Sequence, residues 1–139
     1  MYCKTLSHVG IYPSDFEASL HWYTSVLGLK EAFRLYDKED ASRVNLIYLH
    51  LGPRTFIEIF NQPQRAIRGA IHFSIEVENI EESVAELLPR LPVESVKNPQ
   101  IITGRDGSRI FNFFDPDGNR IELQQFPPES QQAKSLASL

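Results

Sequence analysis

The sequence predicts an α+β fold in which two modules follow one another, each with one strand, one helix and then three strands. Three observations lead to it. Each half of the chain contains one amphipathic helical pattern, short alternating segments typical of strands flank that helix, and the apolar positions of the two helices repeat at a fixed offset. We place the modules at residues 1–64 and 65–127, followed by a flexible tail at 128–139.

The first module begins with a strand expected at residues 4–12. Ser14 and Glu17 then have the spacing of a capping box, which predicts that a helix begins there, and Gly28 is the residue expected to end it. A short turn rich in Gly and Pro separates the last two strands of the module. The three strands are expected at residues 29–36, 44–51 and 55–61.

The second module repeats this order. A strand is expected at residues 69–77, and Asn79 is the residue expected to cap the following helix. The turn sequence Asp-Pro-Asp-Gly-Asn at 115–119 separates the last two strands. The three strands are expected around residues 93–96 or somewhat later, at 109–114 and at 120–126.

An internal repeat supports this division. The apolar stripes of the two helices match residue by residue, and every matched pair is 64 positions apart. Two copies of one unit place equivalent side chains at related positions around a pseudo-twofold axis. The matched pairs are Phe16 and Ile80, Leu20 and Val84, Tyr23 and Leu87, and Leu27 and Leu91.

Four polar residues obey the same offset: His8 with His72, and Glu58 with Glu122. Strand alternation turns these side chains away from the aliphatic neighbours that would pack on a helix. If the two sheets curl into one concave surface, the four groups converge there. Buried carboxylates repel one another, and a divalent ion would neutralise them. The other interpretation is of hydrogen-bonded strand histidines and exposed glutamates.

These donors predict a metal site at His8, Glu58, His72 and Glu122. Nitrogen and oxygen ligands without a thiolate suit Ni, Zn, Mn, Co or Fe(II). Four protein ligands around a six-coordinate ion would leave two positions for water or substrate, which is typical of Lewis-acid catalysis.

Composition excludes several other classes. With 42% hydrophobic residues the chain can bury a core, and its net charge of −4, with 14 basic and 18 acidic residues, argues against nucleic acid and anionic membranes as partners. The start of the chain resembles no signal peptide, and no segment is apolar enough to span a membrane, so we expect a cytoplasmic protein. The single cysteine, Cys3, cannot form an intrachain disulfide.

Two segments carry a family resemblance: Ser-Leu-His-Trp-Tyr-Thr-Ser-Val-Leu-Gly at 19–28 and Asp-Pro-Asp-Gly-Asn-Arg-Ile-Glu-Leu at 115–123. They resemble the vicinal-oxygen-chelate superfamily, which includes glyoxalase I, bleomycin- and fosfomycin-resistance proteins, extradiol dioxygenases and methylmalonyl-CoA epimerase. The resemblance extends over residues 4–126 and implies paired βαβββ modules that form a cup-shaped mixed β-sheet around one metal ion.

The four donors match the ligands of glyoxalase I (lactoylglutathione lyase), so the resemblance implies a divalent-metal-dependent lyase or isomerase. Such an enzyme transfers a proton through a metal-bound enediolate, with Glu58 or Glu122 as the catalytic base. The alternative among enzymes is an epimerase or an extradiol-type dioxygenase of the same superfamily. At the position of Glu58, however, methylmalonyl-CoA epimerases usually carry glutamine, and extradiol dioxygenases have no ligand. A metal-free small-molecule binding or resistance protein is the alternative of another class.

Two departures bear on the substrate. Glyoxalase I places an arginine four residues after its first ligand, where this chain has Tyr12, and the asparagine expected soon after the second ligand is displaced to Asn61. A hydroxy-ketone, an acyl-CoA or another thiol adduct therefore suits the site as well as a glutathione adduct does. The resemblance also implies a homodimer. His50 is expected opposite Ile57, on the helix side of its sheet.

Overall fold

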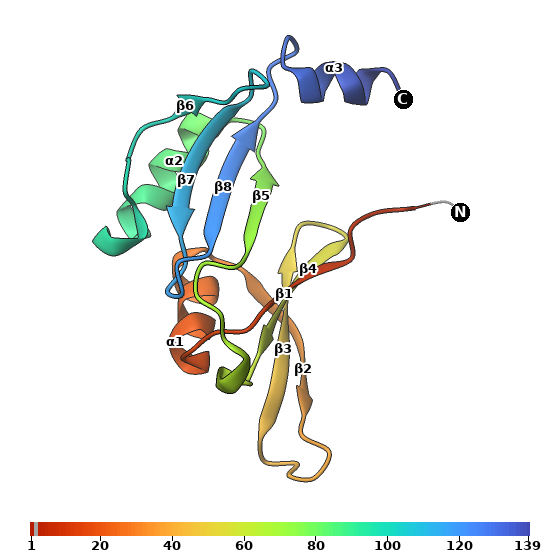
Figure 1. Cartoon of the computed structure of the whole chain (residues 1–139), viewed down its shortest axis with the longest axis vertical. Coiled ribbons are helices and arrows are strands. Elements are labelled where there is room, and N and C mark those ends of the chain that lie inside the picture. The colour runs from red at the N-terminus through yellow and green to blue at the C-terminus, as the bar shows by residue number, and fades with distance from the viewer. Residues whose placement is uncertain (2) are drawn as a thin grey trace. The chain divides into compact units, whose positions relative to one another are not determined.

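The computed structural model describes residue 1 and residues 3–139, so Tyr2, inside the first predicted module, lies outside the described residues. The chain divides into two compact units, Met1–Ala70 and Ile71–Leu139. Figure 1 shows that each unit contains a sheet of strands and a helix between the first and second strand. The predicted α+β class and the repeated βαβββ order are therefore confirmed.

The first unit holds a four-stranded mixed sheet in the order β1-β4-β3-β2. β1 runs parallel to β4, and the other neighbours are antiparallel. Because β1 and β4 are neighbours, residues near both ends of the unit's sequence meet at the same place. The elements are β1 (His8–Ile11), α1 (Phe16–His21), β2 (Lys30–Tyr36), β3 (Val44–Leu51) and β4 (Thr55–Phe60).

α1 begins one residue later than the capping-box pattern predicts. Asp15 is its N-cap, and one carboxylate oxygen of Asp15 accepts a hydrogen bond from the Ala18 backbone N–H at 3.0 Å. After α1 the chain continues as a π-helical turn, Trp22–Val26, which turns Trp22 as well as the predicted Tyr23 into the core. Gly28, with a φ of 81°, follows this turn as expected for a helix terminus.

Alternation along the strands builds the core of the first unit. Odd-numbered residues of β1, β3 and β4 lie on the helix side of the sheet, where those in the middle of the strands are buried, while the even-numbered residues lie on the other side. α1 packs against β4 on the helix side. The core consists of Ile11, Phe16, Trp22, Tyr23, Ile47, Leu49, Ile57 and Ile59.

The second unit repeats this architecture with the sheet order β5-β8-β7-β6, in which β5 and β8 are parallel. α2 begins after Asn79, whose side chain accepts from the Glu82 backbone N–H at 3.0 Å, as the sequence predicts. α2 packs against β7 and β8. The elements are β5 (His72–Glu76), α2 (Ile80–Leu87), β6 (Ile102–Thr103), β7 (Arg109–Phe114) and β8 (Arg120–Gln125).

The edge strand of the second unit lies at the later of the two predicted places. Residues Val93–Ser95 form a short 3₁₀ turn that starts after Pro92, and the edge strand β6 is only two residues long. The segment 128–139, expected to be a flexible tail, contains a helix, α3 (Gln131–Ala137), capped by the Ser130 hydroxyl.

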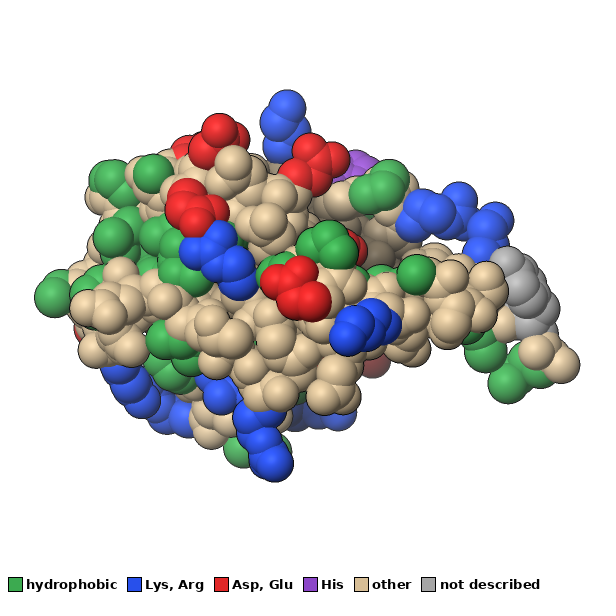
Figure 2. All heavy atoms as spheres, turned by 90° about the horizontal axis from the view of Figure 1, so that it is seen from above, with side chains coloured by type: hydrophobic (Ala, Val, Ile, Leu, Met, Phe, Trp, Pro, Cys, Tyr) green, Lys and Arg blue, Asp and Glu red, His purple; other side chains and the backbone are tan. Residues whose placement is uncertain are grey.

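Charge is distributed without a dominant patch on the face that Figure 2 displays, where acidic and basic side chains are interspersed. None of the helices formed by the described residues is both long and apolar enough to cross a membrane.

Candidate functional site

His8 and Glu58 meet on the even-numbered face of the first sheet. The imidazole Nε2 of His8, on β1, lies 3.5 Å from the carboxylate Oε2 of Glu58, on β4. The His8 side chain is 48% exposed, whereas that of Glu58 is only 9% exposed. A nearly buried carboxylate therefore lies beside a half-exposed imidazole. A carboxylate with so little access to water needs a nearby cation or hydrogen-bond donors to stabilise its charge.

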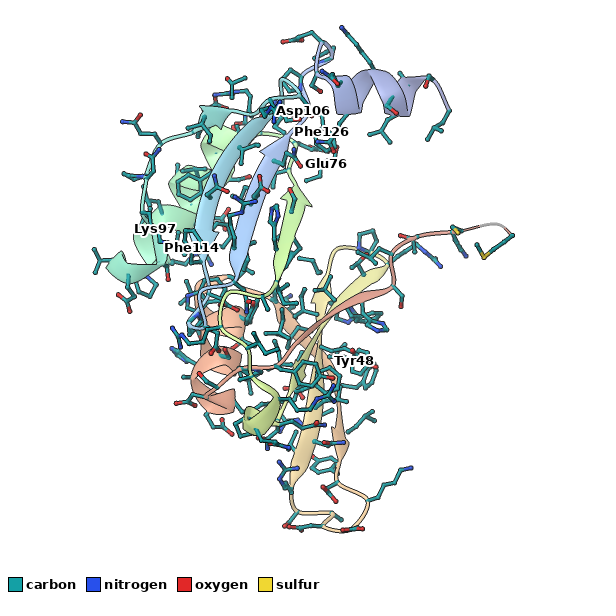
Figure 3. All side chains as sticks on the ribbon, in the orientation of Figure 1. Tyr48, Glu76, Lys97, Asp106, Phe114 and Phe126 are labelled. Carbon is teal, nitrogen blue, oxygen red and sulfur yellow. The ribbon has the colours of Figure 1, made fainter. Side chains whose placement is uncertain are left out.

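Tyr48 is a third polar group at this pair. It lies directly opposite Glu58 in the antiparallel register of β3 and β4. A hydrogen bond to the Glu58 carboxylate raises the pKa of the Tyr48 hydroxyl, and partial burial acts in the same direction. Figure 3 labels Tyr48 on the sheet of the first unit.

Gly10 lies beside the carboxylate of Glu58. It is directly opposite Glu58 in the parallel register of β1 and β4, and a Cβ at this position would lie 3.7 Å from Glu58 Oε2 and 3.3 Å from Phe60 Cε2. A Cβ would therefore touch the carboxylate at an ordinary contact distance and crowd the Phe60 ring. Sequence reasoning did not single this glycine out.

Aromatic rings cover much of the same face. Tyr12 stacks on Phe60 with ring centroids 4.4 Å apart, and the guanidinium of Arg65 lies 4.3 Å from the centroid of the Tyr12 ring. Phe33 stacks on Tyr48 at 4.3 Å and is 46% exposed. This face offers flat apolar surface on both sides of the His8–Glu58 pair.

His72 and Glu122 meet at the equivalent place in the second unit. The Nε2 atom of His72, on β5, contacts Oε1 of Glu122, on β8. The exposures repeat those of the first pair, because the imidazole is 47% exposed and the carboxylate 12%. Ser74 lies opposite Glu122, where the first unit has Gly10, and its hydroxyl donates to Gln124 at 2.8 Å.

The turn at residues 115–119 fixes the register of this second pair. The buried Asp115 carboxylate accepts hydrogen bonds from the backbone N–H groups of Asp117 and Asn119, both at 2.9 Å. The side-chain oxygen of Asn119 in turn accepts from the Ile71 N–H at 3.0 Å. This turn therefore ties the start of β5 to the start of β8 and places Glu122 opposite Ser74.

Arg120 lies beside the second pair. It is opposite His72 in the register, and one guanidinium nitrogen is 3.0 Å from His72 Nδ1 and 3.3 Å from Nε2. Asn112 lies opposite Glu122, and its side-chain oxygen is buried with no hydrogen-bond partner among the described residues. The first unit has Phe56 and Tyr48 at the equivalent positions, opposite His8 and Glu58, so the residues paired with the second histidine and glutamate are more polar.

The structure brings the four predicted ligands together as two pairs, one within each unit. Among the described residues, no three His, Cys, Asp or Glu side chains form one group that could hold a metal ion. Each pair alone presents one imidazole nitrogen beside one carboxylate oxygen, which is half of the ligand set that the sequence predicts.

The expectation for His50 is wrong. The turn at 52–54 pairs Leu51 with Thr55, so His50 lies opposite Phe56, not Ile57. This register places His50 on the same face as Glu58, with its ring 5.2 Å from that of Phe56. The physical reason is the length of the loop, because a shift of one residue transfers a side chain to the other face.

Sequence reasoning also missed Tyr48, Asn112 and the contact between Arg120 and His72. The repeat contains a signal for the first two, because Tyr48 and Asn112 are 64 positions apart, like the ligand pairs. Their alignment opposite the two glutamates depends on strand register, which periodicity does not provide.

Comparison with known proteins agrees with this architecture. Residues 5–123 match the model of the Glyoxalase/Bleomycin resistance protein/Dioxygenase superfamily. The structure of a glyoxalase family protein from Enterococcus faecalis has a TM-score of 0.69 and 28% identity, covering 89% of this chain and 99% of that chain.

Two further solved structures share the fold. Lactoylglutathione lyase from Agrobacterium tumefaciens has a TM-score of 0.63 at 20% identity, over 88% of this chain and 94% of that one. TnmS3, an antibiotic binding protein from Streptomyces sp. CB03234, has a TM-score of 0.64 at 21% identity, over 91% of this chain and 99% of that one. A lyase and an antibiotic binding protein thus both have this fold.

Proposed function

Since the chain belongs to the Glyoxalase/Bleomycin resistance protein/Dioxygenase superfamily, we propose that it is a divalent-metal-dependent lyase or isomerase of glyoxalase I type. One observation carries the proposal. Each unit places a histidine of its first strand beside a glutamate of its last strand, and both pairs have a half-exposed imidazole and a nearly buried carboxylate. Two nearly buried carboxylates are costly for a sheet, so the repetition of this arrangement in both units favours a binding role over a purely structural one.

The donor chemistry fits a metal ion. Two imidazole nitrogens and two carboxylate oxygens suit Ni, Zn, Mn, Co or Fe(II), and two carboxylates would balance the charge of a divalent ion. In this proposal His8, Glu58, His72 and Glu122 hold one ion, with the pairs coming from one chain or from the two chains of a homodimer. When bound, such an ion polarises substrate oxygens and thereby acidifies the adjacent C–H.

The residues around the ligands have separate tasks in this proposal. Glu58 or Glu122 accepts the substrate proton and returns it to the neighbouring carbon, and low exposure keeps both carboxylates away from competing water. The aromatic face beside Glu58 binds the apolar part of the substrate. The guanidinium of Arg65 lies over Tyr12, and that of Arg120 lies beside His72, so each face has a cation that could meet an anionic group of the substrate.

The substrate that we propose is a small molecule with two neighbouring oxygens and an enolisable C–H. A glutathione hemithioacetal, another thiol adduct, a hydroxy-ketone and an acyl-CoA all meet this description. Because Tyr12 occupies the position at which a carboxylate-binding arginine is expected, the thiol carrier is left open in this proposal. We place the reaction in the cytoplasm.

Elemental analysis of the purified protein, after loading with Ni, Zn, Mn or Fe(II), is the decisive experiment. We expect one ion for each set of four ligands, and its loss in the double variant His8→Ala with Glu122→Ala, which removes one ligand from each pair. Exchange of the substrate C–H with deuterium from D₂O then tests enolisation directly. If the native protein binds no ion under any loading, the enzyme proposal fails.

The second candidate function is a metal-free binder of small molecules. The stacked Phe33 and Tyr48 and the stacked Tyr12 and Phe60 favour it, because flat aromatic surfaces bind planar ligands without a metal. Binding of an aromatic antibiotic with equal affinity in the presence and absence of EDTA would support this function. An epimerase or an extradiol-type dioxygenase would instead need metal, and oxygen consumption would identify the dioxygenase.

A further inference from the structure

Glu58 has a neighbour whose hydroxyl can hold it in one orientation. Tyr48 on β3 lies directly opposite Glu58 on β4, so the two side chains are cross-strand neighbours on one face of the sheet, where the hydroxyl can donate to the carboxylate. We propose that Tyr48 is the positioning residue for Glu58, which it holds in the orientation that a metal ligand or a base needs. This inference rests on the proposed function for its chemical meaning, but the contact itself does not depend on metal.

The ring of Tyr48 is fixed from three sides. Phe33 on β2 stacks on it with centroids 4.3 Å apart and planes 20° apart. Phe56 on β4 meets it edge to face at 5.8 Å and 77°, and the His8 imidazole does so at 6.4 Å and 74°. All four strands of the unit therefore contribute to the position of one ring. A hydroxyl on a ring so constrained has few orientations, so it is a fixed donor for the carboxylate.

The carboxylate of Glu58 is enclosed on its other sides as well. Gly10 lies beside Oε2, and His8 Nε2 lies 3.5 Å from that oxygen. The Glu58 side chain is only 9% exposed, so water can satisfy little of its hydrogen-bonding capacity. A hydroxyl of Tyr48 that donates to the carboxylate from β3 would leave the His8 imidazole nitrogen available to a metal ion.

In the second unit the position equivalent to Tyr48 is occupied by Asn112, which has no phenol hydroxyl. Asn112 lies opposite Glu122, and its side-chain oxygen is buried without a hydrogen-bond partner in the part of the chain that the structure describes. The hydroxyl opposite Glu58 is thus a feature of the first unit that the repeat does not require. The two glutamates consequently have different surroundings, although their strands and registers are equivalent.

The substitution Tyr48→Phe tests the inference, because it removes the hydroxyl and keeps the ring and its stacking on Phe33. Partners that orient metal ligands typically change metal affinity by about 10- to 100-fold, and we expect a loss of this size in a Co(II) titration, with an altered visible spectrum of the bound Co(II). The matched control is Tyr36→Phe, which makes the same chemical change at an exposed residue of β2. Equal Co(II) affinity and an unchanged spectrum in Tyr48→Phe would overturn the inference.

A second measurement keeps the inference testable if the native protein binds no metal and the proposed function fails. Denaturant midpoints of Tyr48→Phe, Glu58→Gln and the double variant form a double-mutant cycle in the metal-free protein. We expect the midpoint shift of the double variant to differ clearly from the sum of the two single shifts, because Tyr48→Phe removes the donor of the hydrogen bond and Glu58→Gln replaces its charged acceptor by a weaker, neutral one. Additive shifts would show that the two side chains do not act on one another, and the inference would be wrong.

Discussion

The imidazole of His8 reaches the carboxylate of Glu58 diagonally: the parallel register pairs Glu58 with Gly10, yet Nε2 of His8 lies 3.5 Å from Oε2. The second unit repeats the relationship, since Glu122 is paired with Ser74 and contacts His72. In both units the two residues lie on the same face of neighbouring parallel strands, two positions apart in register.

Single substitutions in either pair distinguish one shared ion from two separate ones. If four ligands hold one ion, His8→Ala and His72→Ala each weaken the same binding event by at least about 100-fold, because ligand loss exceeds the effect of outer partners. Isothermal titration with Zn or Ni measures the affinity and the stoichiometry. His21→Ala is the control, because this exposed histidine lies on α1. Two binding events per chain, each lost in only one variant, would contradict a shared ion.

Gly10 is expected to tolerate no large side chain without displacing Glu58. In Gly10→Val the Cβ, 3.3 Å from the Phe60 ring, requires that ring to shift, and the two methyl groups beyond the Cβ would crowd Oε2, which lies 3.7 Å from the Cβ itself. We expect a tenfold or greater loss of metal affinity and an overpacking cost of about 1–3 kcal/mol in the free energy of unfolding. Metal titration and urea denaturation measure the two effects. Ser74→Val, at the equivalent position of the second unit, shows whether Glu122 responds in the same way.

Arg120 is expected to oppose a metal ion at His72. Its guanidinium lies 3.0 Å from Nδ1 of the imidazole, and two cations that share one site repel each other. Arg120→Met should therefore raise metal affinity several-fold in a competition titration at low salt, and less at high salt. Arg109→Met is the matched control, because it removes the same charge from an arginine that pairs with Glu81 on α2. A weaker affinity in Arg120→Met would refute the expectation.

Asp106 is expected to hold the C-terminal helix in a pH-dependent manner. Hydrogen bonds from Ser108 and then from Gln132 lower the pKa of Asp106 from 3.8 to about 2. Figure 3 labels Asp106 close to the start of α3. Because the folded-state pKa is lowered, this stabilisation is complete above about pH 3.8 and is lost as the pH falls through about 2.

In Asp106→Asn we expect faster amide hydrogen exchange in residues 131–137 than in the native protein at neutral pH. Between pH 4 and pH 2 we expect exchange in this segment to become faster in the native protein, relative to the rest of the chain, but not in Asp106→Asn. Asp40→Asn is the control, because the pKa of Asp40 is lowered in the same way by Ser42, in the loop between β2 and β3 of the first unit. Identical exchange in native protein and Asp106→Asn would mean that α3 is held by other contacts.

The presence of most strands and helices was predictable from the sequence, because each depends on a local pattern of apolar and polar residues. β3 and β7 have the predicted bounds, and Asn79 caps α2 as expected. The edge strand β6 was harder to place, since two residues carry no periodicity. The N-cap of α1 is Asp15 and not the predicted Ser14, because both residue types can cap a helix and the backbone conformation decides which of them does.

The sequence by itself determined the repeat, the helix and strand patterns, and the identity of the four candidate ligands, because a shared offset and strand alternation are visible along one chain. Only the tertiary structure decided which residues meet. The register placed His50 on the ligand face, Tyr48 against Glu58 and Arg120 against His72. These contacts depend on loop lengths and hydrogen-bond pairing between distant strands, and a shift of one residue would transfer each side chain to the opposite face.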